Sequence, residues 1–442
     1  MSTEHTMRRL LDLAAVQPEA VPRGALTLAG FSLFDWLVVA RAGCNEPLSR
    51  IVRDFVCDEG GRPVATLAGS GSKAPARAAA LVNGTISHAL DYDDTHFAHV
   101  GHLSVGILPA ALAVAEQVNA PAVAVRDAFV IGAEAACRVG MVLGRGHYER
   151  GFHQTATAGA FGAAIAAGRL LGLTEARMRN ALSLVATRAS GLKSQFGTMG
   201  KPFNAGIAAA NGVEAASLAQ RGFVSCDDGI GGPQGFIDTH ALEASEAAAW
   251  TDPPPATFIF EDNRYKLHAC CHGLHAMIDA LLEVRRNRDL EPDRVARILV
   301  RTNPRWLRVC DIKRPRTGLE AKFSYGMLAA MVLHGISTAA DGSYTDALGA
   351  DPALLAVAQR VDVAGDPCVS DTAAEVLITL ESGERIETGH DLAAPLSASA
   401  LELGLRDKAR ALLGEATAER LWSGVATLER RSARDLAALL NA

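Results

Sequence analysis

The chain has 442 residues, of which 49% are apolar and 21% are charged, and its formal net charge is −6. This is the composition of an ordinary globular protein that is long enough to bury a large core. The small acidic balance argues against nucleic acid as a partner.

Residues 1–9 lack the apolar stretch of a signal peptide. We find no run of about 18 uninterrupted apolar residues, so no membrane-spanning helix is predicted. The eight cysteines include no C-x-x-C pair and are expected to be small buried residues in a reducing compartment. We therefore expect a cytoplasmic protein without a membrane partner.

Helical spacing of apolar residues dominates the chain up to about residue 250, with Ala and Leu as the main apolar types. The predicted helices are 26–40, 75–90, 109–117, 122–140, 158–171, 175–189 and 205–221. Several are apolar on nearly every side, which indicates burial within a helical assembly. The stretch 158–168 is dense in Ala and Gly, so it allows close helix packing within one chain or across a dimer interface.

The pattern changes after a Pro-rich break at 252–255. Here the sequence predicts a helix at 274–286, a strand at 294–302, a second helix at 322–333 and a β-hairpin at 374–388. Residues 401–440 are helical again. We therefore predict a mainly α fold, with a large all-helical domain built from both chain ends (1–264 and 396–442) and a smaller inserted α+β lid domain (265–395).

The segment 88–104 has the highest density of ionisable groups, with three carboxylates and four histidines within its first fifteen residues. Such groups are costly to bury unpaired. Three interpretations stay open: an acid–base site, a metal site, or a solvated loop in which Asp93 or Asp94 caps the next helix. No H-E-x-x-H ligand frame is present.

Two further segments place a basic residue at a predicted helix start. His153 precedes the Ala/Gly-rich helix, whose N-terminus suits a substrate carboxylate; alternatively, it is a surface residue and Thr155 or Thr157 caps the helix. Lys201 follows a Gly-rich turn that lacks the spacing of a phosphate loop. It is either the partner of a carboxylate or a solvated lysine.

A fourth segment, 265–275, contributes Lys266, His272 and His275 near another helix start. Cys270 or Cys271 could act as a nucleophile with a histidine partner. The alternative is that both cysteines are buried in the core.

These four segments, in this order, resemble the 2-methylcitrate dehydratase (MmgE/PrpD) family, which also includes cis-aconitate decarboxylase and iminodisuccinate epimerase. The matching stretches are Asn83-Gly84, 88–95, 102–104, 161–162, 170–173, 197–202 and 322–324, with 146–148, 151–153 and 196–202 closest to the epimerase branch. The resemblance implies a helical domain joined to an α+β lid, an active site in the cleft between them, a homodimer, and no metal or organic cofactor.

The resemblance also implies the site residues, each within a matching motif: Asp91, Thr95, His102, His153, Lys201 and Lys266. Two positions depart from the decarboxylase pattern. One residue is inserted between Thr95 and His102, so that His99 could take part, and Met327 stands where a tyrosine is expected.

We accordingly expect a lyase or isomerase that moves a proton next to a carboxylate of a small di- or tricarboxylic acid, similar to 2-methylcitrate dehydratase or iminodisuccinate epimerase. Lys201 and Lys266 would stabilise the developing negative charge. His102 would be the acid/base, oriented by Asp91, and His153 the second proton-transfer group.

Substrate binding is assigned to both lysines together with Thr95, His99 and His275. Two alternatives remain. One is a metal-dependent hydrolase or lyase that uses the cluster from Asp91 to His102. The other is a non-catalytic helical dimer that binds a carboxylate.

Overall fold

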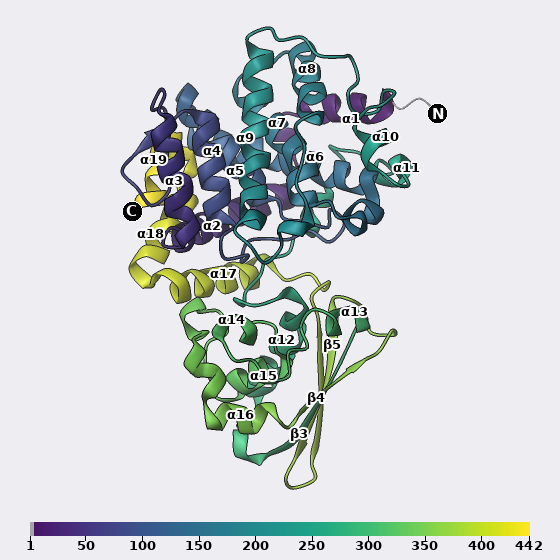
Figure 1. Cartoon of the computed structure of the whole chain (residues 1–442), viewed down its shortest axis with the longest axis vertical. Coiled ribbons are helices and arrows are strands. Elements are labelled where there is room, and N and C mark those ends of the chain that lie inside the picture. Colours follow the sequence, from purple (N-terminus) through teal and green to yellow (C-terminus); the bar gives the residue numbers. More distant parts are fainter. Residues whose placement is uncertain (1–3) are drawn as a thin grey trace. The chain divides into compact units, whose positions relative to one another are not determined.

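The computed structural model describes residues 4–442. Residues 1–3 lie outside the described residues. They are the first residues of the predicted helical domain and of the N-terminal segment that lacks the apolar stretch of a signal peptide. The chain forms two compact units: unit 1 comprises the chain up to Tyr265 together with Glu415–Ala442, and unit 2 is Lys266–Gly414. The fold is mainly helical, as predicted (Figure 1).

The helices of unit 1 are α1 (Glu4–Ala14), α2 (Arg23–Gly43), α3 (Pro47–Glu59), α4 (Ala76–Ser87), α5 (Ser104–Val118), α6 (Ala122–Arg150), α7 (Gln154–Leu170), α8 (Glu175–Ala186), α9 (Gly200–Gln220), α10 (Phe236–His240), α11 (Glu246–Ala249), α18 (Glu415–Ala426) and α19 (Ala433–Ala438). A two-residue antiparallel ladder joins β1 (Ala65–Thr66) to β2 (Lys73–Ala74). In its described residues, unit 1 is therefore almost entirely helical, apart from this ladder and isolated β-bridges.

Helix α7 lies inside unit 1, where α5, α6 and α9 pack around it. Every residue from Gln154 to Gly168 is buried. Its Ala and Gly residues permit this close packing, because the distance between helices depends on the side chains at the contact. The suggestion that this stretch forms a dimer interface is wrong, since helices of the same unit already cover it.

Helix α2 has the length and hydropathy of a membrane span, and it is the one helix in the described part of the chain that meets both criteria. However, 67% of its most apolar window is buried inside the structure. It packs against α4, α5 and α6. A buried core helix of a globular domain has the same composition, and the packing of α2 accounts for its apolar character.

Unit 2 consists of α12 (His275–Asn287), α13 (Pro304–Leu307), α14 (Gly318–Ala321), α15 (Tyr325–Leu333), α16 (Pro352–Ala358) and α17 (Ala398–Leu413), with strands β3 (Val295–Thr302), β4 (Val361–Gly365), β5 (Ala373–Leu380) and β6 (Arg385–Asp391). The sheet order is β4-β3-β5-β6. β3 and β4 are parallel, and the other neighbours are antiparallel. The predicted strand β3 and the β5–β6 hairpin are both present.

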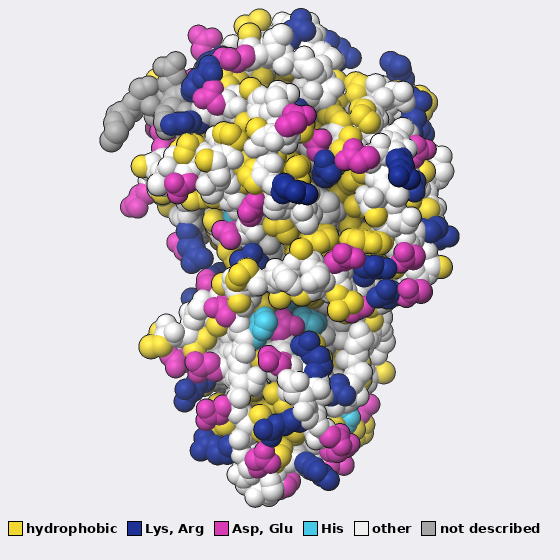
Figure 2. Space-filling view, turned by 180° about the vertical axis from the view of Figure 1, so that it is seen from behind, with side chains coloured by type: hydrophobic (Ala, Val, Ile, Leu, Met, Phe, Trp, Pro, Cys, Tyr) yellow, Lys and Arg dark blue, Asp and Glu magenta, His cyan; other side chains and the backbone are white. Residues whose placement is uncertain are grey.

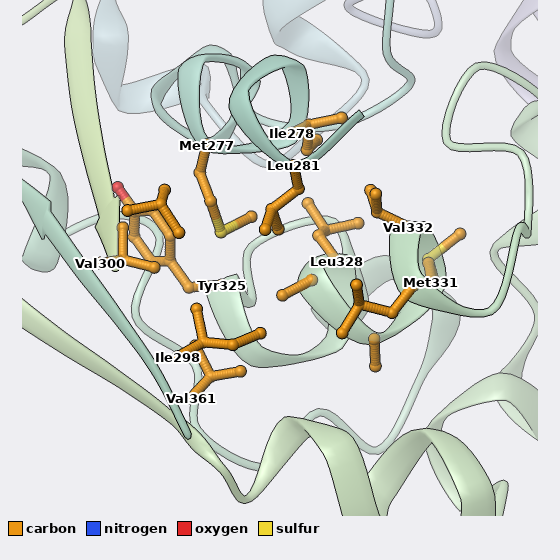
Figure 3. Close-up of a cluster of buried hydrophobic side chains, with 14 of the residues drawn as sticks. Met277, Ile278, Leu281, Ile298, Val300, Tyr325, Leu328, Met331, Val332 and Val361 are labelled. Atoms are coloured by element: carbon orange, nitrogen blue, oxygen red, sulfur yellow. The ribbon is translucent and has the colours of Figure 1, made fainter. Parts of the chain in front are cut away.

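The core of unit 2 lies between this sheet and helices α12 and α15 (Figure 3). Met277 and Leu281 of α12 face Leu328 of α15, and Ile298 and Val300 point in from β3. The alternating burial of β3 matches a strand with one face on the core. Unit 2 thus has a hydrophobic core of its own.

The sequence placed the return to the helical domain at residue 396, whereas the structure groups α17 with unit 2. The side chain of Leu267 lies against Gly404 of this helix. An apolar helix pattern predicts a helix and a buried face, but it does not say which neighbour covers that face.

Acidic and basic side chains are interspersed on the face of the molecule that Figure 2 shows. This distribution fits the small net charge of −6.

Candidate active site

Three helices of unit 1 begin next to one another, and side chains tie their N-termini together. The His102 backbone N–H, just ahead of α5, donates to Thr155 Oγ1 of α7 at 3.0 Å. Asn204 Nδ2 of α9 donates to Nδ1 of His153, the residue before α7, at 3.2 Å. Helix N-termini carry a partial positive charge, so this arrangement favours an anionic ligand.

Asp94 fixes the loop between α4 and α5. It is fully buried, and its Oδ1 accepts hydrogen bonds from the Ser104 backbone N–H at 3.0 Å and from Ser104 Oγ at 2.6 Å. Its Oδ2 accepts from Asn263 Nδ2 at 2.8 Å and from Ser32 Oγ at 3.0 Å. Asp94 thus has the helix-capping role that one of the three interpretations allowed, and it is a structural rather than a reacting carboxylate.

Asp93 lies between two histidines. Its Oδ1 is 2.8 Å from His88 Nδ1, and its Oδ2 is 2.8 Å from His102 Nδ1. The second contact is an ion-pair distance at which the ring is not aligned for a regular hydrogen bond. Sequence reasoning assigned the orienting role on His102 to Asp91, but the structure places Asp93 against Nδ1.

The pKa of Asp93 reflects this environment. Burial acts to raise the pKa of the carboxyl, but the adjacent His102 and His88 overcome that effect and hold it well below its usual range. Asp93 is therefore an ionised, fully buried carboxylate. For His88, burial outweighs the attraction of Asp93 and lowers the pKa, so its ring is neutral and donates from Nδ1.

Asp91 connects His102 to the lysine of the predicted site. Its Oδ2 lies 2.6 Å from Lys201 Nζ, and its Oδ1 lies 3.5 Å from His102 Nε2. The ammonium group of Lys201 also lies 5.2 Å from the centre of the Phe196 ring, a cation–π distance. Asp91 has a backbone φ of 50°, a left-handed conformation that is uncommon outside glycine and is often found at functional sites.

The contacts of His153 determine which of its ring nitrogens carries the proton. Asn204 Nδ2 donates to the Leu192 carbonyl at 3.2 Å as well as to His153 Nδ1 at 3.2 Å. The carbonyl can only accept, so the amide nitrogen must face this way and His153 Nδ1 must be unprotonated. Burial, with His88 and Lys201 nearby, keeps the pKa of His153 well below its ordinary value. His153 is therefore a neutral ring with its proton on Nε2.

The structure thus brings together four of the predicted site residues: Asp91, His102, His153 and Lys201. Thr95 lies in the same loop and is held by paired backbone hydrogen bonds of 2.7 Å with Arg264. His99 is different: it is buried against α6, where its Nδ1 lies 3.1 Å from the Ala136 carbonyl, and burial lowers its pKa to about 3. Its described polar contacts are with Ala136, His96 and the backbone of His102, not with the carboxylates.

Lys266 and His275 belong to unit 2, where both are buried. Burial, followed by His272, His268 and Lys266, holds the pKa of His275 well below its ordinary value. Their part in substrate binding stays a prediction.

Sequence reasoning did not select three members of this group: His88, Asp93 and Asn204. His88 was visible only as part of a dense segment, and Asp93 was considered as a helix cap, because spacing in a loop does not show which groups meet. Asn204 follows Lys201 by three residues, and the i, i+3 positions of a helix lie on one face. That signal could have identified it.

Four side chains of the group also offer ligand atoms for a metal ion. One atom each from His88, Asp91, Asp93 and His102 lies within 4.8 Å of the others. Imidazole nitrogens and carboxylate oxygens are ordinary ligands of zinc and related ions. Lys201 Nζ, 2.6 Å from Asp91, competes for the same carboxylate.

Two family models match the chain: the MmgE/PrpD N-terminal domain over residues 13–246 and the MmgE/PrpD C-terminal domain over residues 268–430. The protein belongs to the MmgE/PrpD family. The resemblance drawn from the sequence motifs is thereby confirmed.

Similar MmgE/PrpD proteins include a cis-aconitate decarboxylase-like protein of Aspergillus oryzae, 29% identical over 64% of this chain and 61% of the relative. The cis-aconitate decarboxylase of Aspergillus terreus is 29% identical over 60% of this chain and 57% of its own length. The human cis-aconitate decarboxylase is 28% identical over 80% of this chain and 77% of its own length. The matches to the two fungal relatives thus span about three fifths of their length.

Proposed function

We propose that this MmgE/PrpD protein is a lyase or isomerase that transfers a proton at a carbon next to a carboxylate of a small di- or tricarboxylic acid. The observation that carries the proposal is the line of contacts His88–Asp93–His102–Asp91–Lys201, which runs from the end of α4 to the N-termini of α5 and α9. It combines an acid–base group with its orienting carboxylate and a cation, which is what this chemistry needs.

His102 is the proposed base. Its Nδ1 side faces the buried Asp93 carboxylate, which stabilises the imidazolium formed when Nε2 takes a proton. The same logic applies to any histidine base with a carboxylate behind it. Removal of the proton places negative charge on the neighbouring substrate carboxylate, so the groups that bind this carboxylate must stabilise the charge as it develops.

Lys201 and His153 are the groups that we propose stabilise the negative charge on the substrate carboxylate. Lys201 supplies a cation, and neutral His153 supplies an N–H donor at Nε2 rather than a second base. Preorganised donors of this kind are worth most in a site shielded from water, and His153 is 2% exposed. Lys266, His275 and Thr95 stay proposed substrate contacts, whereas the fully buried His99 packs against α6.

Dehydration, epimerisation and decarboxylation differ in the second half of the reaction. A dehydratase protonates a leaving hydroxyl, an epimerase returns a proton on the opposite face, and a decarboxylase protonates the carbon that has lost carbon dioxide. The cis-aconitate decarboxylases of Aspergillus terreus and human support decarboxylation of cis-aconitate as one candidate. Met327, where the decarboxylase pattern has tyrosine, favours the other two.

The test is proton NMR of the purified protein in D2O with 2-methylcitrate, citrate, cis-aconitate and iminodisuccinate. We expect deuterium at a carbon next to a carboxylate, or a new product, with one of them. His102→Asn should slow this by about 10²–10⁴-fold. The matched control is His96→Gln in the same loop, which retains a donor for the Ile259 carbonyl that His96 contacts at 2.7 Å and should lose less than about tenfold.

Full activity of both His102→Ala and His153→Ala on the true substrate would refute the assignment of these residues. Thermal stabilisation by one of the acids without exchange or turnover would instead support the non-catalytic binding alternative.

A metal-dependent hydrolase or lyase is the second candidate, because ligand atoms of His88, Asp91, Asp93 and His102 lie within 4.8 Å of one another. Elemental analysis of the purified protein distinguishes the two. Stoichiometric zinc, iron or manganese together with loss of activity on chelation would favour the metal site. Activity that survives exhaustive chelation would exclude it.

A further inference from the structure

Two cysteine sulfurs of unit 2 lie in contact. The Sγ atoms of Cys271 and Cys310 are 3.0 Å apart, and neither cysteine is part of a disulfide in the structure. A disulfide bond is about 2.05 Å long, so the sulfurs need to approach by only about 1 Å. Cys310 is fully buried, whereas Cys271 is partly exposed.

Contacts other than the sulfurs hold the two segments together. The Cys271 backbone N–H donates to the Lys322 carbonyl at 3.1 Å, and the Cys310 N–H donates to the Trp306 carbonyl at 2.7 Å. The Trp306 ring packs on Gly273, where an added Cβ would lie 2.4 Å from the ring. Tyr325 Oη also donates to the Gly273 carbonyl at 3.0 Å. The packing therefore positions the sulfurs before any bond forms.

The direction of the sulfur–sulfur hydrogen bond distinguishes the two thiols. Cys310 Sγ donates to Cys271 Sγ. This hydrogen bond and burial together raise the pKa of Cys310, while Lys266 nearby acts in the opposite direction. Because Cys310 is buried and donates a hydrogen bond, whereas Cys271 is partly exposed, Cys271 is the thiol that loses its proton more readily. Since the thiolate is the reactive form of cysteine, Cys271 is the attacking sulfur.

We infer that Cys271 and Cys310 form a reversible intramolecular disulfide when the protein meets a peroxide. The Cys271 thiolate attacks one peroxide oxygen, the O–O bond breaks, and Cys271 becomes a sulfenic acid as hydroxide leaves. The Cys310 sulfur then attacks the Cys271 sulfur, the S–O bond breaks, and the departing hydroxide takes the Cys310 proton as water. Overall, two thiols are oxidised and hydrogen peroxide is reduced to two waters.

The bond would restrain the segment from Lys266 to His275, which carries two of the proposed substrate residues. The disulfide does not rest on the proposed function, because the sulfur contact and the reaction with peroxide are independent of any substrate. Its test accordingly uses readouts that do not involve enzyme activity.

The experiment treats the full-length protein with hydrogen peroxide, blocks remaining thiols by alkylation, and analyses a tryptic digest by mass spectrometry. We expect peptide 267–285 linked to peptide 309–313, with a mass lower by two hydrogen atoms than the sum of the two reduced peptides. Dithiothreitol should remove the link. Oxidised wild-type protein should also melt at a higher temperature than reduced protein, because a cross-link restricts the unfolded chain.

Peptide 267–285 also contains Cys270, so Cys270→Ala is the matched control and should retain the link. Cys271→Ser and Cys310→Ser should lose both the link and the oxidative increase in melting temperature. The inference is overturned if peroxide oxidises the exposed Cys57, Cys226 and Cys368 while Cys271 and Cys310 stay available for alkylation. A link that disappears in Cys270→Ala would also overturn it.

Discussion

At the scale of single residues, the side-chain amide of Asn204 has an unusual influence, because it donates to both the Leu192 carbonyl and Nδ1 of His153. A protonated Nδ1 would face this donor and repel it. His153 is therefore restricted to one neutral form, in which only Nε2 can donate. Asn204 acts as a positioning residue, since it controls the chemistry of His153 without itself being a proton-transfer group.

Replacement of Asn204 by Asp should change the pH profile rather than abolish activity at every pH. The new carboxylate would accept a proton from Nδ1 and raise the pKa of His153. Below that pKa the imidazolium still donates from Nε2, but above it the neutral ring carries its proton on Nδ1 and loses this donor. We expect kcat to fall on the alkaline side with a smaller change in KM, measured as kcat and KM between about pH 5 and 9.

The matched control for this experiment is Asn211→Asp on the same helix. Asn211 is also buried and donates to a backbone carbonyl, that of Arg188, at 2.7 Å. It should cost stability without moving the alkaline limb. If both variants show the same pH profile, Asn204 has only a structural role.

The buried histidines predict how stability depends on pH. Burial lowers the pKa of His99 to about 3 and that of His147 to about 4, whereas an unfolded histidine titrates near about 6.5. Below about pH 6.5 the unfolded chain binds more protons than the folded one, so stability falls as the pH falls. For fully buried His99 the slope approaches about 1.4 kcal/mol per pH unit down to its folded pKa. Urea unfolding at pH 7.5, 6.5 and 5.5 measures it.

His334 provides the control, because its side chain is exposed. The variant His334→Gln should leave the pH dependence of the unfolding free energy unchanged, whereas His99→Gln should reduce the slope even if it also lowers stability at neutral pH. A flat stability profile of the wild-type protein between pH 7.5 and 5.5 would contradict the prediction.

At the same scale, the sequence indicates which residue types take part but not how they pair. The motifs selected Asp91, His102 and Lys201, and the structure places these three in contact. Asp93 and Asp94 are neighbours with the same side chain, yet one lies between two histidines and the other caps α5. Their roles differ because successive residues in a loop point in different directions, and a local pattern does not contain that information.

At the scale of secondary-structure elements, strong periodicity predicted the helices well and their ends less well. The helix predicted at 122–140 was expected to end at residue 140, whereas α6 continues to Arg150 across an irregular Gly144 with φ of 71°. Strand β4 was not predicted, because its five residues include Asp362 and Gly365 and show little alternation. It is formed by parallel pairing with β3, a contact between distant segments.

The crossing of α4 and α9 predicts the effect of a single methyl group. A Cβ at Gly206 would lie 2.3 Å from the Leu81 carbonyl oxygen of α4 and 2.2 Å from Thr85 Oγ1. Gly206→Ala must push the two helices apart and should cost about 1–3 kcal/mol or more of unfolding free energy. Because α9 carries Lys201 and Asn204, activity should fall as well. Urea unfolding and the deuterium-exchange assay measure both effects.

Gly159 of α7 is the matched control, since it is also a buried helical glycine but an added Cβ would have its nearest contact at 3.8 Å, with Ala208. Gly159→Ala should be neutral or stabilise the protein by up to about 1 kcal/mol, because alanine is the better helix former. Equal destabilisation by both substitutions would show that the crossing distance is not the controlling feature.

At the scale of the whole molecule, the sequence predicted a helical part from both ends of the chain and an α+β part between them. The structure separates into two compact units, with one boundary after Tyr265 and the other after Gly414. The change in local pattern near residue 250 was visible, because strands alternate and helices do not. The grouping of α17 with unit 2 was not accessible to such reasoning. The homodimer, which the family resemblance implies, stays a prediction.

Each unit has its own core, so a cavity in one should loosen that unit more than the other. Leu328 of α15 is fully buried in unit 2 (Figure 3), and Leu328→Ala should cost about 2–5 kcal/mol. Hydrogen exchange followed by mass spectrometry should show faster exchange in α12, α15 and β3, with α7 and α9 unchanged.

The reciprocal variant is Leu182→Ala, which removes a fully buried side chain from α8 of unit 1. It should accelerate exchange in α7, α8 and α9 and leave β3 and β5 protected. If either variant accelerates exchange equally in both units, the chain unfolds as one cooperative body, and the two cores are energetically coupled despite their separate packing. If exchange stays confined to the mutated unit, each core stabilises its own unit. A mutation in the unit 2 core would then alter Lys266 and His275 without loosening the His102 cluster.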